Sequence, residues 1–349
     1  MQMITRTESK CQTNAWKNIL TEGFQRVDDL LSYLEWPAHA REPFAAEQLF
    51  SMRVPQPFAS RMAKNDAKDP LLLQVLPQSQ EFTQQPGFST DPLQEQATSL
   101  PGLLHKYTSR VLLILSGGCA INCRYCFRRH FPYSQHTISR QQQATWLTYL
   151  KEHPEINEVI LSGGDPLIVD DNQLNTLITG IAEIKTIKRL RVHTRLPVVI
   201  PERINDKLLS WAQSQPKLKT IFVLHINHPN EIDHSVENAL SKLREVGVQL
   251  LNQSVLLKDI NSDAKTLANL SEKLFELNVI PYYLHTLDQT MGTQHFEVAP
   301  NKITSLYKAL LAELPGFLVP KLVREIPGEK SKLPYGIPTS NPLFASLHN

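Results

Sequence analysis

Three of the four cysteines in this 349-residue chain lie within eight residues, at Cys119, Cys123 and Cys126, in the spacing C-x3-C-x2-C. The first of them follows a short apolar run, 111–115, and a Ser-Gly-Gly turn. Three thiolates on one loop can hold three irons of a cubane iron–sulfur cluster, and they leave the fourth iron without a protein ligand. An open metal position is a place for chemistry, as it is in a catalytic zinc site. The loop therefore predicts a catalytic iron–sulfur cluster.

Two other interpretations of this loop stay open at the level of the sequence. The three cysteines and His130 could form a structural Cys3His zinc knuckle, and the basic run 128–130 could be a nucleic-acid patch. Structural zinc sites usually take ligand pairs from two separated segments, so the crowded spacing favours the cluster. Cys11 stands far upstream of the other three, and we interpret it as an incidental thiol.

Composition narrows the class of protein. The chain is 41% hydrophobic and carries a formal net charge of only +2, which gives no reason to expect a nucleic-acid or membrane partner. No apolar run approaches the roughly 18 residues that a membrane span needs, and the first residues lack the apolar core of a signal peptide. Unpaired thiols are typical of a reducing compartment. We therefore expect a cytoplasmic enzyme.

The chain divides into three predicted parts. Residues 1–105 form a mostly helical segment punctuated by prolines, with helices expected at 16–36 and 45–52 and no long element between the prolines at 55 and 101. Residues 106–315 alternate strands with amphipathic helices, and residues 316–349 form a C-terminal segment. The predicted strands are 111–115, 158–161, 189–193, 220–226, 249–256 and 279–285; the predicted helices are 140–152, 172–184, 202–213, 235–246, 263–277 and 301–314.

Six strand–helix units predict parallel strands joined by right-handed crossovers, and hence a partial (β/α)6 barrel. Ligands gather at the carboxyl ends of such strands. The polar residues at these ends are Cys119, Gly163, Gly164, Asp165, Arg195, His225, His228, Asn252, Gln253 and Asp288. The two glycines would let the backbone approach a ligand closely. His225 is the candidate for a cofactor contact, whereas His228 is expected to be a buried, hydrogen-bonded histidine.

The cysteine motif, with Tyr125 before its last cysteine, resembles the signature of the radical S-adenosylmethionine (SAM) enzymes. In that family the methionine part of SAM chelates the open iron, and a Gly-Gly-Asp element like 163–165 contacts its amino group. Further motifs at 101–107, 195–199, 225–231, 252–257 and 281–283 resemble those of the lysine 2,3-aminomutases, over about residues 40–335. The run 123–133 and the short C-terminus resemble the bacterial branch that makes (R)-β-lysine for modifying elongation factor P.

This resemblance implies a set of roles. Gly163, Gly164 and Asp165 would contact the methionine amino group of SAM, and Arg195, His225 and Gln253 would be further cofactor-binding residues. Pyridoxal 5′-phosphate (PLP) would be carried by Lys332, with Lys330 as the fallback. Its phosphate would lie near Lys106, Arg110 and Arg195; for the first two, a solvated surface cation is the alternative. Arg128 would bind the substrate carboxylate, and Asp288 and Glu325 its ε-ammonium. The family has an aspartate where this chain has Glu325, so a surface glutamate paired with Arg324 is the alternative there.

The implied reaction converts (S)-α-lysine to (R)-β-lysine by a 5′-deoxyadenosyl radical mechanism with a [4Fe-4S] cluster, SAM and PLP. The implied partners are an electron donor, elongation factor P with its lysyl-transferring ligase, and a possible second copy in a homo-oligomer. The family's zinc does not carry over, because this chain ends soon after its last motif. Two alternatives stay open: a radical SAM enzyme without PLP, and a zinc-stabilised binding module.

Overall fold

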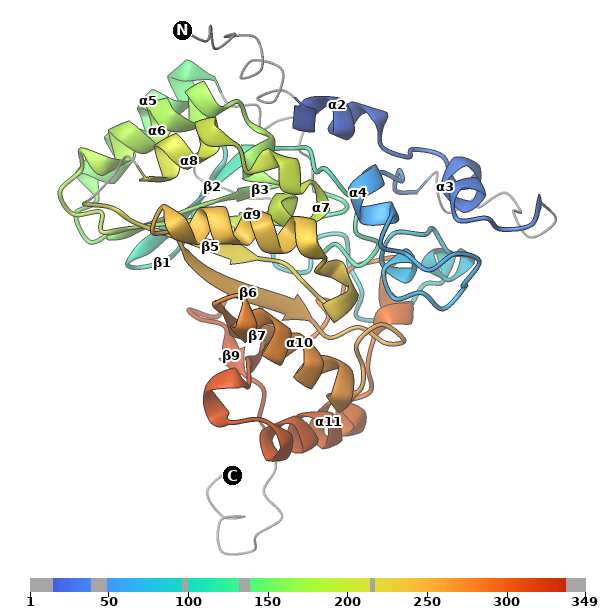
Figure 1. Cartoon of the computed structure of the whole chain (residues 1–349). Helices are drawn as coiled ribbons and strands as arrows, with labels where there is room; N and C mark the ends of the chain where they lie inside the picture. Colours follow the sequence, from blue (N-terminus) through green and yellow to red (C-terminus); the bar gives the residue numbers. More distant parts are fainter. Residues whose placement is uncertain (1–14, 39–48, 96–99, 132–138, 214–216, 337–349) are drawn as a thin grey trace, which may run out of the picture.

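The computed structural model describes residues 15–38, 49–95, 100–131, 139–213 and 217–336. Their strands form one nine-stranded sheet whose spatial order follows the chain, from β1 to β9 (Figure 1). The strands are β1 (Leu103–Tyr107), β2 (Arg110–Ser116), β3 (Glu158–Gly163), β4 (Arg189–Thr194), β5 (Lys219–Leu224), β6 (Gln249–Val255), β7 (Val279–His285), β8 (Lys321–Arg324) and β9 (Leu333–Pro334). Neighbours from β2 to β8 pair in parallel, and the two edge strands pair antiparallel.

The six predicted strands are confirmed as β2 to β7, and the radical SAM α/β architecture with them. The sequence analysis missed β1, β8 and β9. β1 contains His105 and Lys106 among its five residues, and β9 has only two residues, one of them a proline. Such segments lack the apolar run or the regular alternation by which strands are recognised.

The helices between the strands are α5 (Arg140–Glu152), α6 (Asp171–Ala182), α8 (Asp206–Gln213), α9 (His234–Glu245), α10 (Ala264–Glu276) and α11 (Pro300–Glu313). In Figure 1, α5, α6, α8 and α9 lie along one side of the sheet. Three of the six helices, α6, α9 and α10, are capped by aspartates whose carboxylates accept a backbone N–H, namely Asp170, Asp233 and Asp263. All six lie within a few residues of prediction except α8, which begins only at Asp206 because Pro201–Arg203 forms a separate 3-10 turn.

Side-chain alternation separates the core from the cavity. In β4, Leu190 and Val192 are fully buried in the apolar core that the strands share with the helices, while Arg191 and His193 line a cavity on the other face. Successive side chains of a strand point to opposite faces, so one strand serves both purposes. The apolar half of the pattern holds the sheet against its helices, and the polar half faces the space where a ligand would bind.

The N-terminal segment departs from prediction in one place. The continuous helix expected over 16–36 is two helices, α2 (Ala15–Glu22) and α3 (Val27–Tyr33), and the chain breaks between them because Phe24 exchanges two backbone hydrogen bonds with Val54. The helix expected at 45–52 is wrong for residues 49–52, which are not helical; residues 45–48 lie outside the described ranges. Between the prolines only short elements form, as predicted: α4 (Gln56–Ala59), η3 (Leu72–Gln74) and η4 (Ser79–Phe82).

The predicted three-part division of the chain remains a prediction. The strand β1 crosses the boundary expected between residues 105 and 106, and β8 and β9 extend the central sheet with residues of the C-terminal segment. Within the ranges that the structure describes, none of the helices has the length and apolar character required to cross a membrane.

Candidate active site

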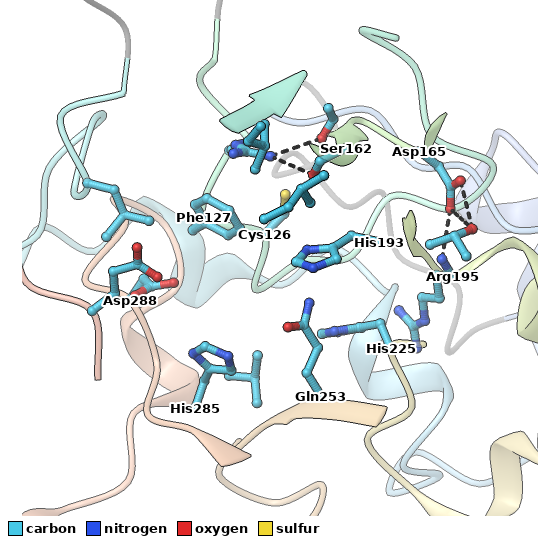
Figure 2. A pocket seen from close by; sticks show the side chains of 18 of the residues that line it. Cys126, Phe127, Ser162, Asp165, His193, Arg195, His225, Gln253, His285 and Asp288 are labelled. Carbon is cyan, nitrogen blue, oxygen red and sulfur yellow. Dashed lines mark hydrogen bonds between the residues drawn. The ribbon is translucent and has the colours of Figure 1, made fainter. Parts of the chain in front are cut away.

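A cavity of about 360 Å³ lies on the inner face of the sheet, toward the carboxyl ends of its parallel strands. All of the predicted site residues contribute to its lining: Cys119, Cys123, Cys126, Gly163, Gly164, Asp165, Arg195, His225, Gln253, Lys106, Arg110, Arg128, Asp288, Glu325 and Lys332. Figure 2 shows His193, His225 and Gln253 pointing toward one another, with Asp288 on one side and Arg195 on the other. Residues far apart in the sequence are therefore brought into one space.

The three cysteine thiols face this cavity without a disulfide partner. Burial, and then the neighbouring thiol and carboxyl groups, raise the pKa of Cys119 well above its ordinary value. Burial and Cys123 likewise raise the pKa of Cys126 to about 11. Thiols crowded in this way ionise only when positive charge compensates them, and a metal centre supplies that charge. The donor set therefore fits three irons of a cluster.

The zinc-knuckle alternative gains no support from the geometry. The Nε2 atom of His130 lies 3.0 Å from the carbonyl oxygen of Met291, to which it can donate, and His130 is absent from the cavity lining to which the three cysteines belong. Across the described part of the chain, no group of three or more His, Cys, Asp or Glu side chains is arranged to hold a single metal ion.

The Gly163-Gly164 turn is required by close backbone packing. Gly163 has a φ of 124°, in the region that favours glycine. A Cβ atom on Gly164 would lie only 2.1 Å from the carbonyl oxygen of Gly118, just before the first cysteine. The N–H of Gly164 donates to the carbonyl of Ser116 at 2.7 Å, and the N–H of Asp165 donates to that of Gly118 at 2.8 Å. The turn therefore joins the end of β3 to the start of the cysteine loop.

The carboxylate of Asp165 is hydrogen-bonded to other groups of the protein. It accepts hydrogen bonds from the Thr194 hydroxyl at 2.8 Å and from the backbone N–H groups of Leu167, Arg195 and Leu196. Burial raises its pKa to about 6 in spite of these bonds. The side chain ties the ends of β3 and β4 together, so a contact from this residue to SAM would come from its backbone.

Arg195 is buried beside the cysteine loop. Its Nη1 atom donates to the Cys123 sulfur at 2.8 Å and to the Tyr125 hydroxyl at 3.0 Å, and its Nη2 atom donates to Gln74 at 2.7 Å and to Glu231 at 2.9 Å. Burial alone would lower its pKa, but Cys123 and Glu231 raise it well above the ordinary value. Both terminal nitrogens are therefore engaged by the protein, and a phosphate contact from Arg195 stays a prediction.

His225 continues this network on the cavity side. Its Nε2 atom lies 2.9 Å from the Tyr125 hydroxyl, and the two rings stack with centroids 5.7 Å apart. Burial and the charge of Arg195 lower the pKa of His225 to about 3, so the imidazole is neutral. By contrast, His228 does not line the cavity. Its Nδ1 atom accepts the N–H of Asn230 at 3.1 Å, so it is hydrogen-bonded as predicted, but its side chain is only partly buried.

Arg128, the predicted carboxylate ligand, enters the cavity from the cysteine loop. Its Nε and Nη2 atoms each lie 2.8 Å from one oxygen of Glu95, and its Nη1 atom donates to the Ser162 hydroxyl at 3.3 Å and to the Gly163 carbonyl at 3.4 Å. A guanidinium fork suits a carboxylate geometrically. Because Glu95 contacts that fork, a substrate carboxylate bound there would compete with it.

The acidic residues form the opposite wall. Glu325 lies 3.2 Å from the Lys106 amine and also pairs with Lys332, and its side chain is only 11% exposed. Burial opposes ionisation of Glu325, yet Lys332 and Lys106 hold its pKa down at about 2. The alternative of a surface glutamate paired with Arg324 is therefore wrong. Burial, and then Glu325, raise the pKa of Asp288 to about 7.

The two candidate PLP lysines differ in position. Lys332 lines the cavity and pairs with Glu325, whereas Lys330 does not belong to its lining. Lys106 and Arg110 lie on β1 and β2 beside Tyr107, with the Arg110 guanidinium 4.0 Å from that ring's centroid. Of the two candidates for the covalent cofactor, only Lys332 therefore lines the cavity, and the roles of Lys106 and Arg110 at the phosphate stay predictions.

Several lining residues were given no site role from the sequence, although three of them lie in or beside motifs noted there: Glu95, Ser162, Arg191, His193, Tyr282, Tyr283 and His285. Burial lowers the pKa of His285 to about 3, with Lys332 adding to the effect. The Nε2 atom of His193 is buried and has no hydrogen-bond partner among the described residues. The signal that could have found Arg191, His193, Tyr283 and His285 is their place at alternate positions of β4 and β7, on the face away from the helices.

Comparisons with known proteins agree with this site. Residues 113–270 match the Radical SAM superfamily. The chain is 50% identical to an L-lysine 2,3-aminomutase of Escherichia coli (strain K12), over 91% of this chain and 94% of that protein. It is 48% identical to a protein of the same name from Haemophilus influenzae, over 92% and 95%. It is 32% identical to one from Clostridium subterminale, over 93% and 79%.

Proposed function

Because the chain belongs to the L-lysine 2,3-aminomutase family of radical SAM enzymes, we propose that it converts (S)-α-lysine to (R)-β-lysine with the help of PLP. The single observation that carries this proposal is the pair of acids, Asp288 and Glu325, in the cavity that also holds the three cysteines and Lys332. An ammonium group leaving water for such a space needs a buried partner of opposite charge.

The charges of the cavity match the two ends of lysine. The substrate carboxylate goes to Arg128, whose guanidinium already donates to the carboxylate of Glu95. The ε-ammonium goes to Asp288 and Glu325. A dicarboxylic amino acid such as glutamate would bring a second negative charge to these two acids, and like charges in a dry site repel strongly. The acidic wall therefore selects for a basic side chain.

In this proposal the protein's own residues hold the reacting groups. Bound SAM and the reduced cluster would supply the radical that removes hydrogen from the β-carbon, and bound PLP would assist migration of the nitrogen. Cys119, Cys123 and Cys126 would hold the cluster, and Lys332 would hold PLP with its phosphate near Lys106 and Arg110. The histidines His225 and His285 have depressed pKa values of about 3, so they add no positive charge beside these groups.

The test is an anaerobic assay of the purified protein with two substrates. We expect iron and sulfide in cluster proportion, PLP fixed to Lys332 by borohydride reduction and found by peptide mass spectrometry, and β-lysine from L-lysine. Iron and sulfide without PLP would favour the alternative of another radical SAM enzyme. Formation of β-glutamate from glutamate, with no β-lysine from lysine, would refute the substrate assignment while leaving the family intact.

The biological setting is part of the same proposal. We place the enzyme in the cytoplasm, where its product would be attached to elongation factor P by a lysyl-transferring ligase and where an electron donor would reduce the cluster. The support is the resemblance of the run 123–133 to the branch that serves this factor. Loss of β-lysine from elongation factor P in cells that lack this protein, restored by its gene, is the measurement that tests it.

A further inference from the structure

We propose that Arg195, anchored by Glu231, is a positioning residue that raises the reduction potential of the iron–sulfur cluster through its hydrogen bond to the Cys123 sulfur. The donor atom Nη1 lies 2.8 Å from that sulfur. This inference rests on the family's cluster and not on the choice of lysine as substrate. It assigns Arg195 a role that a contact to SAM or to a phosphate would not give it.

The guanidinium is held from several sides. Besides Cys123, its terminal nitrogens donate to the Tyr125 hydroxyl at 3.0 Å, to Gln74 at 2.7 Å and to Glu231 at 2.9 Å. The Phe58 ring centroid lies 5.2 Å from its central carbon. The arginine side chain is only 7% exposed. A group with so many partners cannot swing away from the sulfur without breaking buried hydrogen bonds, each of which is costly to leave unmade.

Glu231 is itself fixed. Its side chain is fully buried, and its other carboxylate oxygen accepts the backbone N–H of Asn227 at 2.9 Å, that of His228 at 3.2 Å and the Gln74 amide at 3.1 Å. On the opposite side, Asp165 accepts the backbone N–H of Arg195 at 2.8 Å. The position of the guanidinium is therefore set from both its head and its backbone, as expected of a residue that orients a metal ligand.

The physical effect follows from charge. One-electron reduction makes the cluster and its thiolates more negative, so a fixed N–H donor and positive charge beside one sulfur stabilise the reduced form more than the oxidised form. Burial strengthens this effect, because nearby charges are poorly screened there. The reduction potential consequently rises, and a weaker reductant can load the electron. Glu231 offsets part of the charge, while the hydrogen bond to sulfur remains.

The experiment is a dithionite titration of the holoenzyme without SAM, followed by electron paramagnetic resonance, with iron content measured on the same samples. Omitting SAM removes any contribution from contacts between Arg195 and that cofactor. Glu231→Gln keeps the arginine and removes a buried negative charge, so its midpoint potential should shift upward. Arg195→Met combined with Glu231→Gln avoids an unpaired buried glutamate and removes the donor, so its midpoint should shift below that of the wild type.

The matched control is the buried pair Arg203 and Asp171, which are 2.7 Å apart and lie outside the cavity lining. Arg203→Met with Asp171→Asn should leave the midpoint unchanged. If Arg195 were only a structural clamp, the double variant would lose iron and its remaining clusters would titrate at the wild-type potential, which would overturn the proposal. Since the titration contains no lysine and follows the signal of the cluster itself, failure of the proposed substrate would leave this result untouched.

Discussion

The carboxylate of Glu325 joins the amines of Lys106 and Lys332, and the first of these contacts spans 3.2 Å. The residue proposed to bind the substrate ammonium therefore pairs with the lysine proposed to carry PLP. Attachment of PLP would take away the free amine of Lys332 and release one oxygen of Glu325. The two binding events are thus linked through one carboxylate, because a buried acid keeps a positive partner in either state.

Glu325→Gln tests this relationship. The amide keeps the shape but loses the charge that an ammonium needs, so we expect kcat/KM for lysine to fall by about 100-fold, the scale of losing one partner of a buried ion pair. Cluster iron should stay at the wild-type amount. Glu329→Gln is the matched control, since Glu329 is exposed on the same segment, and it should leave kcat/KM unchanged. Equal kcat/KM values for the two variants would remove Glu325 from the site.

Lys332→Ala should abolish covalent PLP while the iron content stays normal, because the cysteines lie on a different segment of the cavity wall. Borohydride reduction followed by peptide mass spectrometry measures the attachment directly. Lys330→Ala is the control and should retain PLP. The reverse result, with PLP lost only from the Lys330 variant, would show that the assignment is displaced by two residues.

Replacement of Cys119, Cys123 or Cys126 by Ala should each prevent cluster assembly, because a missing thiolate leaves an iron that the remaining ligands cannot hold. Iron and sulfide analysis after anaerobic reconstitution is the measurement. Cys11 lies outside the described residues, and Cys11→Ala should bind iron as the wild type does. Loss of iron from the Cys11 variant would contradict the assignment of three ligands.

Much of the architecture was accessible from the sequence because β2 to β7 are short β-rich runs, some continuously apolar like β2 and some alternating like β4, and the segments between them have a helical period. Both patterns are local. The break between α2 and α3 was not accessible, since it depends on Phe24 pairing with Val54, thirty residues further along the chain. Local periodicity carries no information about such a bridge. Tertiary pairing therefore overrode a helical pattern that was otherwise continuous.

In the site, too, features formed by adjacent residues could be predicted, whereas contacts between distant segments could not. The cysteines and the Gly-Gly-Asp turn were predictable because their residues are adjacent in the sequence. The anchoring of Arg195 was not, because Gln74 comes from the N-terminal segment and Glu231 from the loop after β5, and each looks like an ordinary polar residue in its own surroundings. The pairing of Arg128 with Glu95 was missed for the same reason. Contacts between distant segments become visible only when the fold assembles them.

The last prediction concerns the pH dependence that Asp288 causes. Burial and the nearby Glu325 raise the pKa of Asp288 from the ordinary 3.8 to about 7. Lysine binding favours the ionised carboxylate, so below pH 7 Asp288 must lose one proton when lysine binds. As the pH rises toward 7, KM for lysine should therefore fall about tenfold per pH unit, and above pH 7 it should become constant. Asp288→Asn should lose this slope and cut turnover by about 100-fold or more.

The pH dependence of folding stability has the opposite sign, because folding favours the protonated carboxyl of Asp288. Protonated Asp288 contributes stability that is full below pH 3.8 and lost as the pH rises through 7. The stability of Asp288→Asn, measured by thermal unfolding without added lysine, should therefore exceed that of the wild type by more at pH 8 than at pH 5. If the stability difference between variant and wild type were the same at both pH values, and the variant kept the pH slope of KM, a group other than Asp288 would be the one that titrates.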